Sequence, residues 1–218
     1  MAQRTIHYLF GELFSQAVPL RDKNRFLLGS ILPDAFAEPH QRDVTHFTNT
    51  SLPGNQAFYD FGRFREQFAA LIACDDLYLG YYMHLVEDNF FRQFIYSQHG
   101  LGELVRGKAG FTILHDDYHR LNAHIVTKYD LTYGITRPDG LEHEPLYSIV
   151  PFTADSFLEQ MRGDFNEQPT GSTRFLTEAL LDEFLEKYLA DGIKELRCVS
   201  AGGSYLDPAS FAWVRKAF

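Results

Sequence analysis

The chain has 218 residues, a formal net charge of −9 and 45% hydrophobic residues, among them 20 phenylalanines and 12 tyrosines. This length and apolar content predict one domain over residues 1–218 with a single large core. The 20 basic side chains form no Lys- or Arg-rich run, which argues against a nucleic-acid-binding groove. There are only two cysteines, Cys74 and Cys198, and no C-x-x-C pair, which argues against a thiolate zinc finger and a disulfide scaffold. No apolar stretch has the length of a signal peptide or of a transmembrane helix, so we expect a soluble cytoplasmic protein.

The predicted elements are mostly helices. Helical spacing of apolar residues predicts helices over 6–16, 22–32 and 55–73, with a polar loop over 35–54. The clearest helix is 77–96, which is apolar on nearly every face and follows the capping residue Asp75. Further helices are expected over 109–129, 154–161 and 173–189, the last stopped by Asp191-Gly192, and a final helix is expected from Asp207-Pro208. Residues 131–145 suggest a small hairpin or an ordered loop around Arg137-Pro138-Asp139-Gly140. About eight helices and almost no strand predict an all-α fold.

The strongest chemical feature of the central helix is His84 followed by Asp88. Residues four apart share one helix face, so an imidazole nitrogen and a carboxylate oxygen can bind the same cation. A buried histidine hydrogen-bonded to a carboxylate is the simpler alternative. Ionisable side chains inside so apolar a helix are costly unless they are paired or bind metal, which favours the metal site. Tyr81, one turn before His84, either lines the pocket or belongs to the core.

A second polar cluster lies on the predicted helix 109–129. His115 and His119 are four residues apart, and Asp116 and Asp117 lie between them. The spacing fits metal ligands, and a solvated polar helix face is the alternative.

Three further residues complete the set of candidate ligands. His7 lies in the first predicted helix, Asp34 follows a proline at the start of the polar loop, and His46 lies within that loop. Each has an ordinary structural explanation alone, but helical bundles build metal sites from ligands on separate elements. Mixed His and Asp ligation suits zinc, or another divalent transition metal, better than calcium. The candidate ligands are His7, Asp34, His46, His84, Asp88, His115 and His119.

The order of these motifs resembles the zinc-dependent phospholipase C family, which is related in fold to fungal single-strand nucleases. The similarity is greatest to its small intracellular bacterial branch. The motifs are Thr5-Ile6-His7-Tyr8, the Leu-Gly-Ser-Ile-Leu-Pro-Asp segment ending at Asp34, Thr45-His46-Phe47, Gly80 to Asp88, and His115 to Asn122. Residues 130–218 carry no such motif.

The resemblance implies specific roles. A near-central zinc would be bound by Asp34, His46, His84 and Asp88, and His7 would bind a neighbouring zinc that shares Asp88. Asp34 would be a candidate general base in the hydrolysis of a phosphodiester or phosphomonoester by a metal-activated water.

Two departures from the family pattern affect the number of ions, which we expect to be one to three. Secreted members use the α-amine of an N-terminal tryptophan as a zinc ligand, whereas this chain starts Met-Ala and its one tryptophan is Trp213. The zinc at His7 is therefore expected to be weaker, differently ligated or absent. The family's remaining zinc uses two histidines and a glutamate, for which His115 and His119, with Asp116 and Asp117 adjacent, are the nearest equivalents, and Phe94 stands where a first histidine is expected.

The sequence therefore favours a zinc-dependent hydrolase acting on a small phosphoester or phospholipid-like substrate. Two alternatives stay open. One is a phosphohydrolase of the helical His-Asp superfamily, centred on His115-Asp116. The other is a metal-binding protein with a degenerate site that hydrolyses nothing. A metal bridged by Asp88 would favour the phospholipase-like interpretation, and one centred on His115-Asp116 would favour the first alternative.

Overall fold

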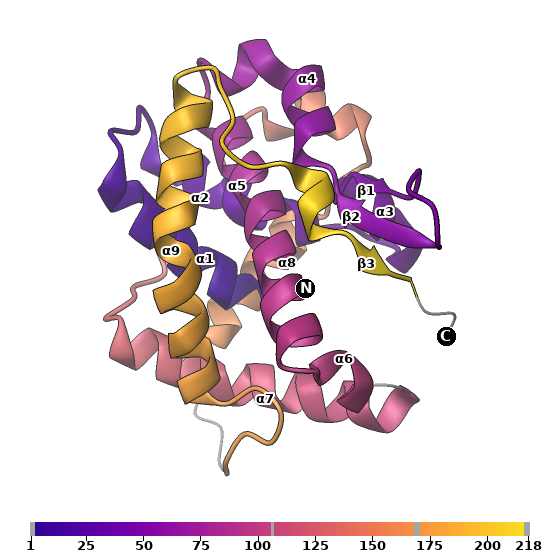
Figure 1. The fold of residues 1–218 in the computed structure, drawn as a ribbon. Helices are drawn as coiled ribbons and strands as arrows, with labels where there is room; N and C mark the ends of the chain where they lie inside the picture. Colours follow the sequence, from indigo (N-terminus) through magenta and orange to yellow (C-terminus); the bar gives the residue numbers. More distant parts are fainter. Residues whose placement is uncertain (1–2, 106, 168–170, 216–218) are drawn as a thin grey trace.

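The computed structural model describes residues 3–105, 107–167 and 171–215, and this part of the chain is predominantly helical (Figure 1). Its α-helices are α1 (Arg4–Ala17), α2 (Lys23–Ile31), α3 (Arg42–Thr45), α4 (Phe61–Ile72), α5 (Asp76–Phe91), α6 (Leu101–Leu104), α7 (Gly107–Lys128), α8 (Ala154–Asp164) and α9 (Glu178–Ser200). The short 3₁₀ turns are η1 (Leu32–Asp34), η2 (Pro39–Gln41), η4 (Leu141–His143), η5 (Pro145–Ser148) and η6 (Pro208–Phe211). A π-helical segment, η3 (Arg92–Gln98), continues α5. The prediction of an all-α fold is confirmed, with one small sheet added.

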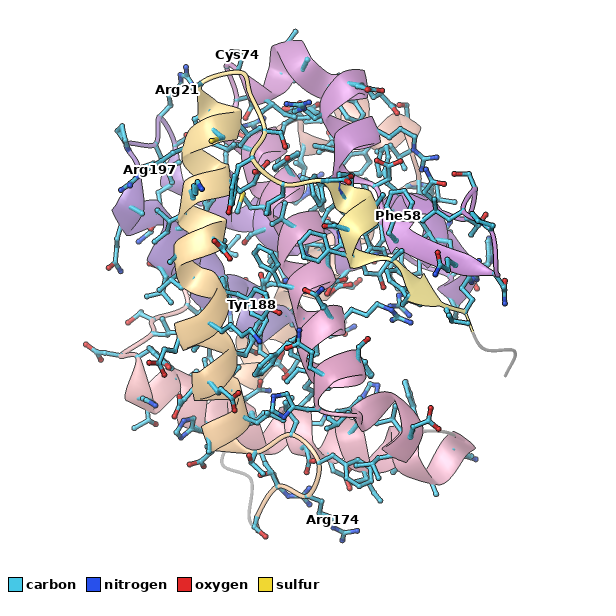
Figure 2. The ribbon with its side chains drawn as sticks, in the orientation of Figure 1. Arg21, Phe58, Cys74, Arg174, Tyr188 and Arg197 are labelled. Carbon is cyan, nitrogen blue, oxygen red and sulfur yellow. The ribbon has the colours of Figure 1, made fainter. Side chains whose placement is uncertain are left out.

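Helix α5 forms the centre of the molecule, as the sequence predicts. Asp75 caps it by accepting a hydrogen bond from Leu77 N at 3.0 Å, and every residue of α5 is buried. Helices α2, α4 and α9 pack around α5, and α7 lies across one end of the molecule in Figure 1. Side chains such as Tyr188 fill the space between α9 and α5 (Figure 2), where the Tyr188 ring stacks on Phe90 with centroids 4.7 Å apart.

The closest helix contact is between α2 and α5, and glycine makes it possible. A Cβ on Gly80 would lie 2.1 Å from Phe26 O, and a Cβ on Gly29 would lie 2.0 Å from Leu77 O. Real Cβ atoms do not approach backbone so closely. Glycine at both positions therefore lets the two backbones touch.

The prediction of one helix over 55–73 is wrong at its start. Residues 56–59 form strand β2 (Gln56–Tyr59), which pairs antiparallel with β1 (Thr48–Asn49) on one side and β3 (Trp213–Val214) on the other. The strand ends at Asp60, whose side chain accepts a hydrogen bond from Arg63 N and caps α4. The helical spacing of the aromatic residues holds only from Phe61 onward.

Residues 131–145 form an ordered loop, one of the two structures predicted for them, and the alternative of a small hairpin is wrong. The segment bonds to helices α1 and α2: Tyr8 donates to Thr132 O at 2.7 Å, and the Asn24 side chain bonds both backbone groups of Thr136. The predicted turn at 137–140 is present, with Gly140 at a φ of 73°.

Two further helix predictions need correction. Helix α9 begins at Glu178, later than predicted, because Asp117 holds the backbone N–H groups of 174–176. It also continues through Gly192, where a Cβ would meet the Phe14 ring at 2.6 Å, so this glycine permits packing and does not stop the helix. The expected last helix is only the 3₁₀ turn η6, capped by Asp207. No helix in the described ranges has both the length and the apolarity needed to cross a bilayer.

Candidate metal centre

Five of the seven candidate ligands meet in the core of the molecule. His7 comes from α1, Asp34 from η1, His46 from the end of α3, and His84 and Asp88 from α5. The three histidines and Asp88 have no exposed surface, and the Asp34 side chain is 12% exposed. Two groups, His7 with His84 and Asp88, and Asp34 with His46 and His84, each have ligand atoms within 4.8 Å of one another and could hold a metal ion.

Each histidine of this cluster has its Nδ1 fixed by an oxygen. His84 Nδ1 lies 2.8 Å from Ser30 O, and His46 Nδ1 lies 3.0 Å from Arg42 O. His7 Nδ1 lies 2.8 Å from Glu87 Oε2. A backbone carbonyl can only accept, so the Nδ1 atoms of His84 and His46 carry protons. Their Nε2 atoms therefore turn toward the cluster as potential ligands, the arrangement typical of metal-bound histidines.

The Nε2 atoms of His46 and His84 lie 3.2 Å apart. Two lone pairs cannot face each other at this distance without a cation between them, either a proton or a metal ion. His7 Nε2 and Asp34 Oδ1 are also buried without a hydrogen-bond partner in the described part of the chain. Because buried polar atoms are rarely left unsatisfied, the donor set fits a bound metal ion.

The two carboxylates each face histidines on two sides. His46 Nε2 lies 3.3 Å from Asp34 Oδ1 and 3.4 Å from Asp88 Oδ2. The other oxygens of the same carboxylates lie toward His7 Nε2, at 3.8 Å for Asp34 Oδ2 and 3.5 Å for Asp88 Oδ1. Both aspartates could therefore contact two ions at once, one near His46 and one near His7.

The electrostatics of the metal-free cluster place one positive charge on His7. Burial alone would lower the pKa of His7, but Glu87, Asp88 and Asp34 raise it to about 9. Burial and the neighbouring His7 lower the pKa of His84 to about 3, so that imidazole is neutral. Burial would raise the pKa of Asp34, but the facing imidazole of His46 and the nearby imidazoles of His84 and His7 hold it well below its usual value. The cluster thus carries ionised carboxylates that a metal cation would neutralise.

Tyr81 supports the cluster from the core side. It has no exposed surface, its ring stacks on Phe64 with centroids 4.7 Å apart, and its hydroxyl donates to Thr45 O at 2.6 Å. Tyr81 therefore fixes the segment that carries His46 and belongs to the core, the second of the two roles considered for it.

The α7 residues lie apart from this cluster. His115 and Asp116 are exposed, and neither belongs to a metal-competent group of the described residues. Asp117 is buried, but its carboxylate accepts three backbone N–H groups, from Arg174, Phe175 and Leu176, and so has a structural role.

His119 belongs to a separate group with Asp164 and Glu167. Its Nδ1 lies 2.8 Å from Glu167 Oε1, and the Asp164 carboxylate is already paired with the Arg4 guanidinium. Arg4 thus occupies the position of a cation in that group.

The sequence analysis did not identify Glu87 as a partner of His7. His84, Glu87 and Asp88 occupy positions i, i+3 and i+4, which share one side of a helix, so the spacing could have revealed it. No local sequence pattern indicates that Arg42 and Tyr59 lie beside the cluster, because the residues that they contact come from other segments of the chain.

In comparisons with known proteins, no family model, no curated protein and no solved structure matches this chain.

Proposed function

We propose that the protein is a zinc-dependent hydrolase of phosphoester bonds, with the five-residue cluster as its active centre. The observation that carries the proposal is the spacing of the ligand atoms. Four ligands about 2.0–2.1 Å from a tetrahedral zinc lie about 3.3 Å from one another. The atoms around His46 Nε2 lie at 3.2, 3.3 and 3.4 Å, and His84 Nε2 lies 3.9 Å from Asp88 Oδ2.

The position of His7, on the opposite side of both carboxylates from His46, supports a site for two ions. The outer oxygens of Asp34 and Asp88 face His7, so one aspartate can bind two cations. Paired cations are common in phosphoester hydrolases, where bound metal lowers the pKa of water and neutralises charge on the phosphoryl oxygens.

Asp34 is the ligand that reaches the surface of the cluster, with 12% of its side chain exposed. This supports its assignment to the face where substrate would enter. Its lowered pKa keeps the carboxylate ionised at neutral pH, which suits a metal ligand. Asp34→Asn should preserve the fold, by circular dichroism, and lose most turnover.

The decisive experiment compares Asp88→Ala with His119→Ala. Asp88 contacts histidines on both sides of the cluster, whereas His119 lies in the separate α7 group. Asp88→Ala should lower the zinc content at more than one position and abolish hydrolysis of chromogenic phosphoesters. Loss of a direct ligand should exceed the about 10–100-fold effect typical of groups that orient ligands. His119→Ala should cost at most one ion.

The alternatives have distinct outcomes. Larger metal loss in His119→Ala would move the centre to α7 and would contradict the proposal. Zinc bound at the cluster without turnover on phosphomonoesters or phosphodiesters would identify a non-catalytic metal-binding protein. The exposed positions of His115 and Asp116 give no support to a His-Asp superfamily centre.

A further inference from the structure

A cationic and aromatic surface borders the metal centre on the side of the small sheet. We call it the arginine surface and define it by Arg42, Tyr59, Arg92, Tyr96 and Trp213. The Tyr59 ring lies 5.3 Å from the ring of the metal-centre residue His46 and 4.8 Å from the Trp213 ring, by centroids. The phenol of Tyr59 thus links the cluster to strand β3, which lies next to β2 in Figure 1.

Each arginine of this surface has an aromatic partner. Arg42 Nη2 donates to the Tyr59 hydroxyl at 2.8 Å. The Arg92 guanidinium carbon lies 3.9 Å from the centroid of Trp213 and 5.6 Å from that of Tyr96. Stacking on Trp213 holds the Arg92 guanidinium plane and leaves its edge N–H groups available to an anion.

Arg92 has unused donor capacity. Its Nε is buried and has no hydrogen-bond partner among the residues that the structure describes. Both Arg42 and Arg92 are half-buried, so a ligand can reach them from solvent. A charged donor in this environment binds an anion more strongly than a fully exposed one, because water competes less.

The two positive charges act on the same site. Arg42 donates to the Tyr59 hydroxyl, and Arg92 stacks on Trp213, whose ring lies 4.8 Å from that of Tyr59 by centroids, so both charges lie near one side chain. Arg42 also adjoins the metal centre, because its backbone oxygen lies 3.0 Å from His46 Nδ1.

Backbone geometry also marks this place. Arg92 is the first residue of the π-helical segment η3, which follows directly on the helix that carries His84 and Asp88. Tyr96 lies one turn later in the same segment. Wide π-helical turns are rare in proteins and are frequently found at functional sites.

We propose that Arg42 and Arg92 bind the phosphoryl dianion of a substrate beside the metal centre, and that the protein therefore prefers phosphomonoesters to phosphodiesters. This inference rests on the proposed phosphoester hydrolase function. A monoester phosphoryl group has a second pKa of about 6 and carries nearly two negative charges at neutral pH, whereas a diester carries one. Two fixed guanidinium groups next to bound metal match the higher charge, and their fork of N–H groups fits the additional terminal oxygen.

The first test measures binding of inorganic phosphate to the zinc-loaded protein by calorimetry. Arg92→Gln and Arg42→Gln should each weaken phosphate binding by about 10- to 100-fold, the loss expected for a charge-assisted hydrogen bond. The matched control is Arg162→Gln on α8, an arginine with 56% exposure whose partner is Glu159, and it should change binding less than about twofold. Zinc content and circular dichroism establish that each variant is folded and loaded.

Conservative variants keep the test valid if a glutamine variant does not fold. Arg92→Lys and Arg42→Lys keep the charge but lose the planar fork, so each should bind phosphate more weakly than the original protein. Unchanged phosphate affinity in the folded variants at both positions would overturn the proposal.

The second test compares a phosphomonoester and a phosphodiester with the same chromogenic leaving group. Arg92→Gln should lower kcat/KM for the monoester by about 10- to 100-fold and for the diester by less than about threefold. Equal losses would contradict the preference. If the original protein hydrolyses neither compound, the proposed hydrolase function is refuted, and the phosphate measurement still decides whether the two arginines bind a dianion. If it hydrolyses both and the arginine variants bind phosphate normally, only the proposed role of the two arginines is refuted.

Discussion

We expect the contact between α2 and α5 to determine whether the candidate metal centre can form, and Gly80→Ala tests this directly. A Cβ on Gly80 would lie 2.1 Å from Phe26 O, while ordinary contact begins at 3.4 Å, so the helices must separate by the difference of about 1.3 Å. The same movement would stretch the 2.8 Å contact between His84 Nδ1 and Ser30 O to about 4.1 Å, beyond hydrogen-bonding distance.

Two opposing effects set the expected size of the loss. Alanine favours the helix by about 1 kcal/mol relative to glycine. Overpacking usually costs about 1–3 kcal/mol, and a clash between backbones belongs at or above the upper end. We therefore expect Gly80→Ala to lower the free energy of unfolding by about 2 kcal/mol or more. The zinc affinity should fall by about 10- to 100-fold, because His84 loses the group that orients it.

Urea unfolding of the metal-free protein and chelator competition with zinc measure the two effects. The matched control is Gly163→Ala in α8, where a Cβ would meet nothing within 4 Å. That variant should be as stable as the original protein or up to about 1 kcal/mol more stable, with unchanged zinc affinity. If Gly80→Ala matches this control in both measurements, the helix contact does not position the site and the reasoning is refuted.

Two further predictions concern His7. Glu87→Gln removes the anionic acceptor 2.8 Å from His7 Nδ1 and should weaken zinc binding by about 10- to 100-fold in chelator competition. The exposed control Glu142→Gln should leave zinc affinity unchanged, and equal affinities in the two variants would exclude Glu87 as an orienting group. The pKa of His7 is raised to about 9 without metal, so His7 holds a proton at about pH 7.5 that zinc must displace. Calorimetry in buffers of different ionisation enthalpy should therefore detect proton release that declines as the pH rises through about 9. A release that stays constant across this range, or that His7→Gln leaves unchanged, would contradict the assignment.

The parts of the site that the sequence predicts best depend on one local rule. Helical spacing puts His84 and Asp88 on one face of α5, and in the structure their ligand atoms lie 3.9 Å apart. The same rule fails to distinguish ligands from structural carboxylates on α7. Asp117 has the residue type and the spacing of a ligand, but its carboxylate bonds to the backbone of residues 174–176. That contact joins positions more than 50 apart, and no periodicity in either segment indicates it.

The features of the fold that the sequence analysis did not predict also depend on contacts between distant segments. Strand β2 pairs with Trp213 and Val214, which lie at the other end of the described chain. The sequence around residue 58 does not indicate this distant partner, and its aromatic spacing alone predicts a helix. Arg42 and Arg92 occur outside any basic run, and only the fold brings both beside Tyr59. Sequence patterns report the period of one element, whereas these residues depend on which elements become neighbours.

The ligand residues are therefore necessary for the centre but not sufficient. Three histidines must turn Nε2 toward the two carboxylates, and each is oriented by an oxygen from a different source: Glu87, Ser30 O and Arg42 O. Ser30 O reaches His84 only because glycine at positions 29 and 80 lets α2 approach α5. A chain with all five ligands but alanine at these two positions would keep the motif and lose the geometry. The helix contact and the orienting oxygens thus belong to the candidate metal centre as much as its proposed ligands do, since affinity depends on how well the ligand atoms are held in place before an ion binds.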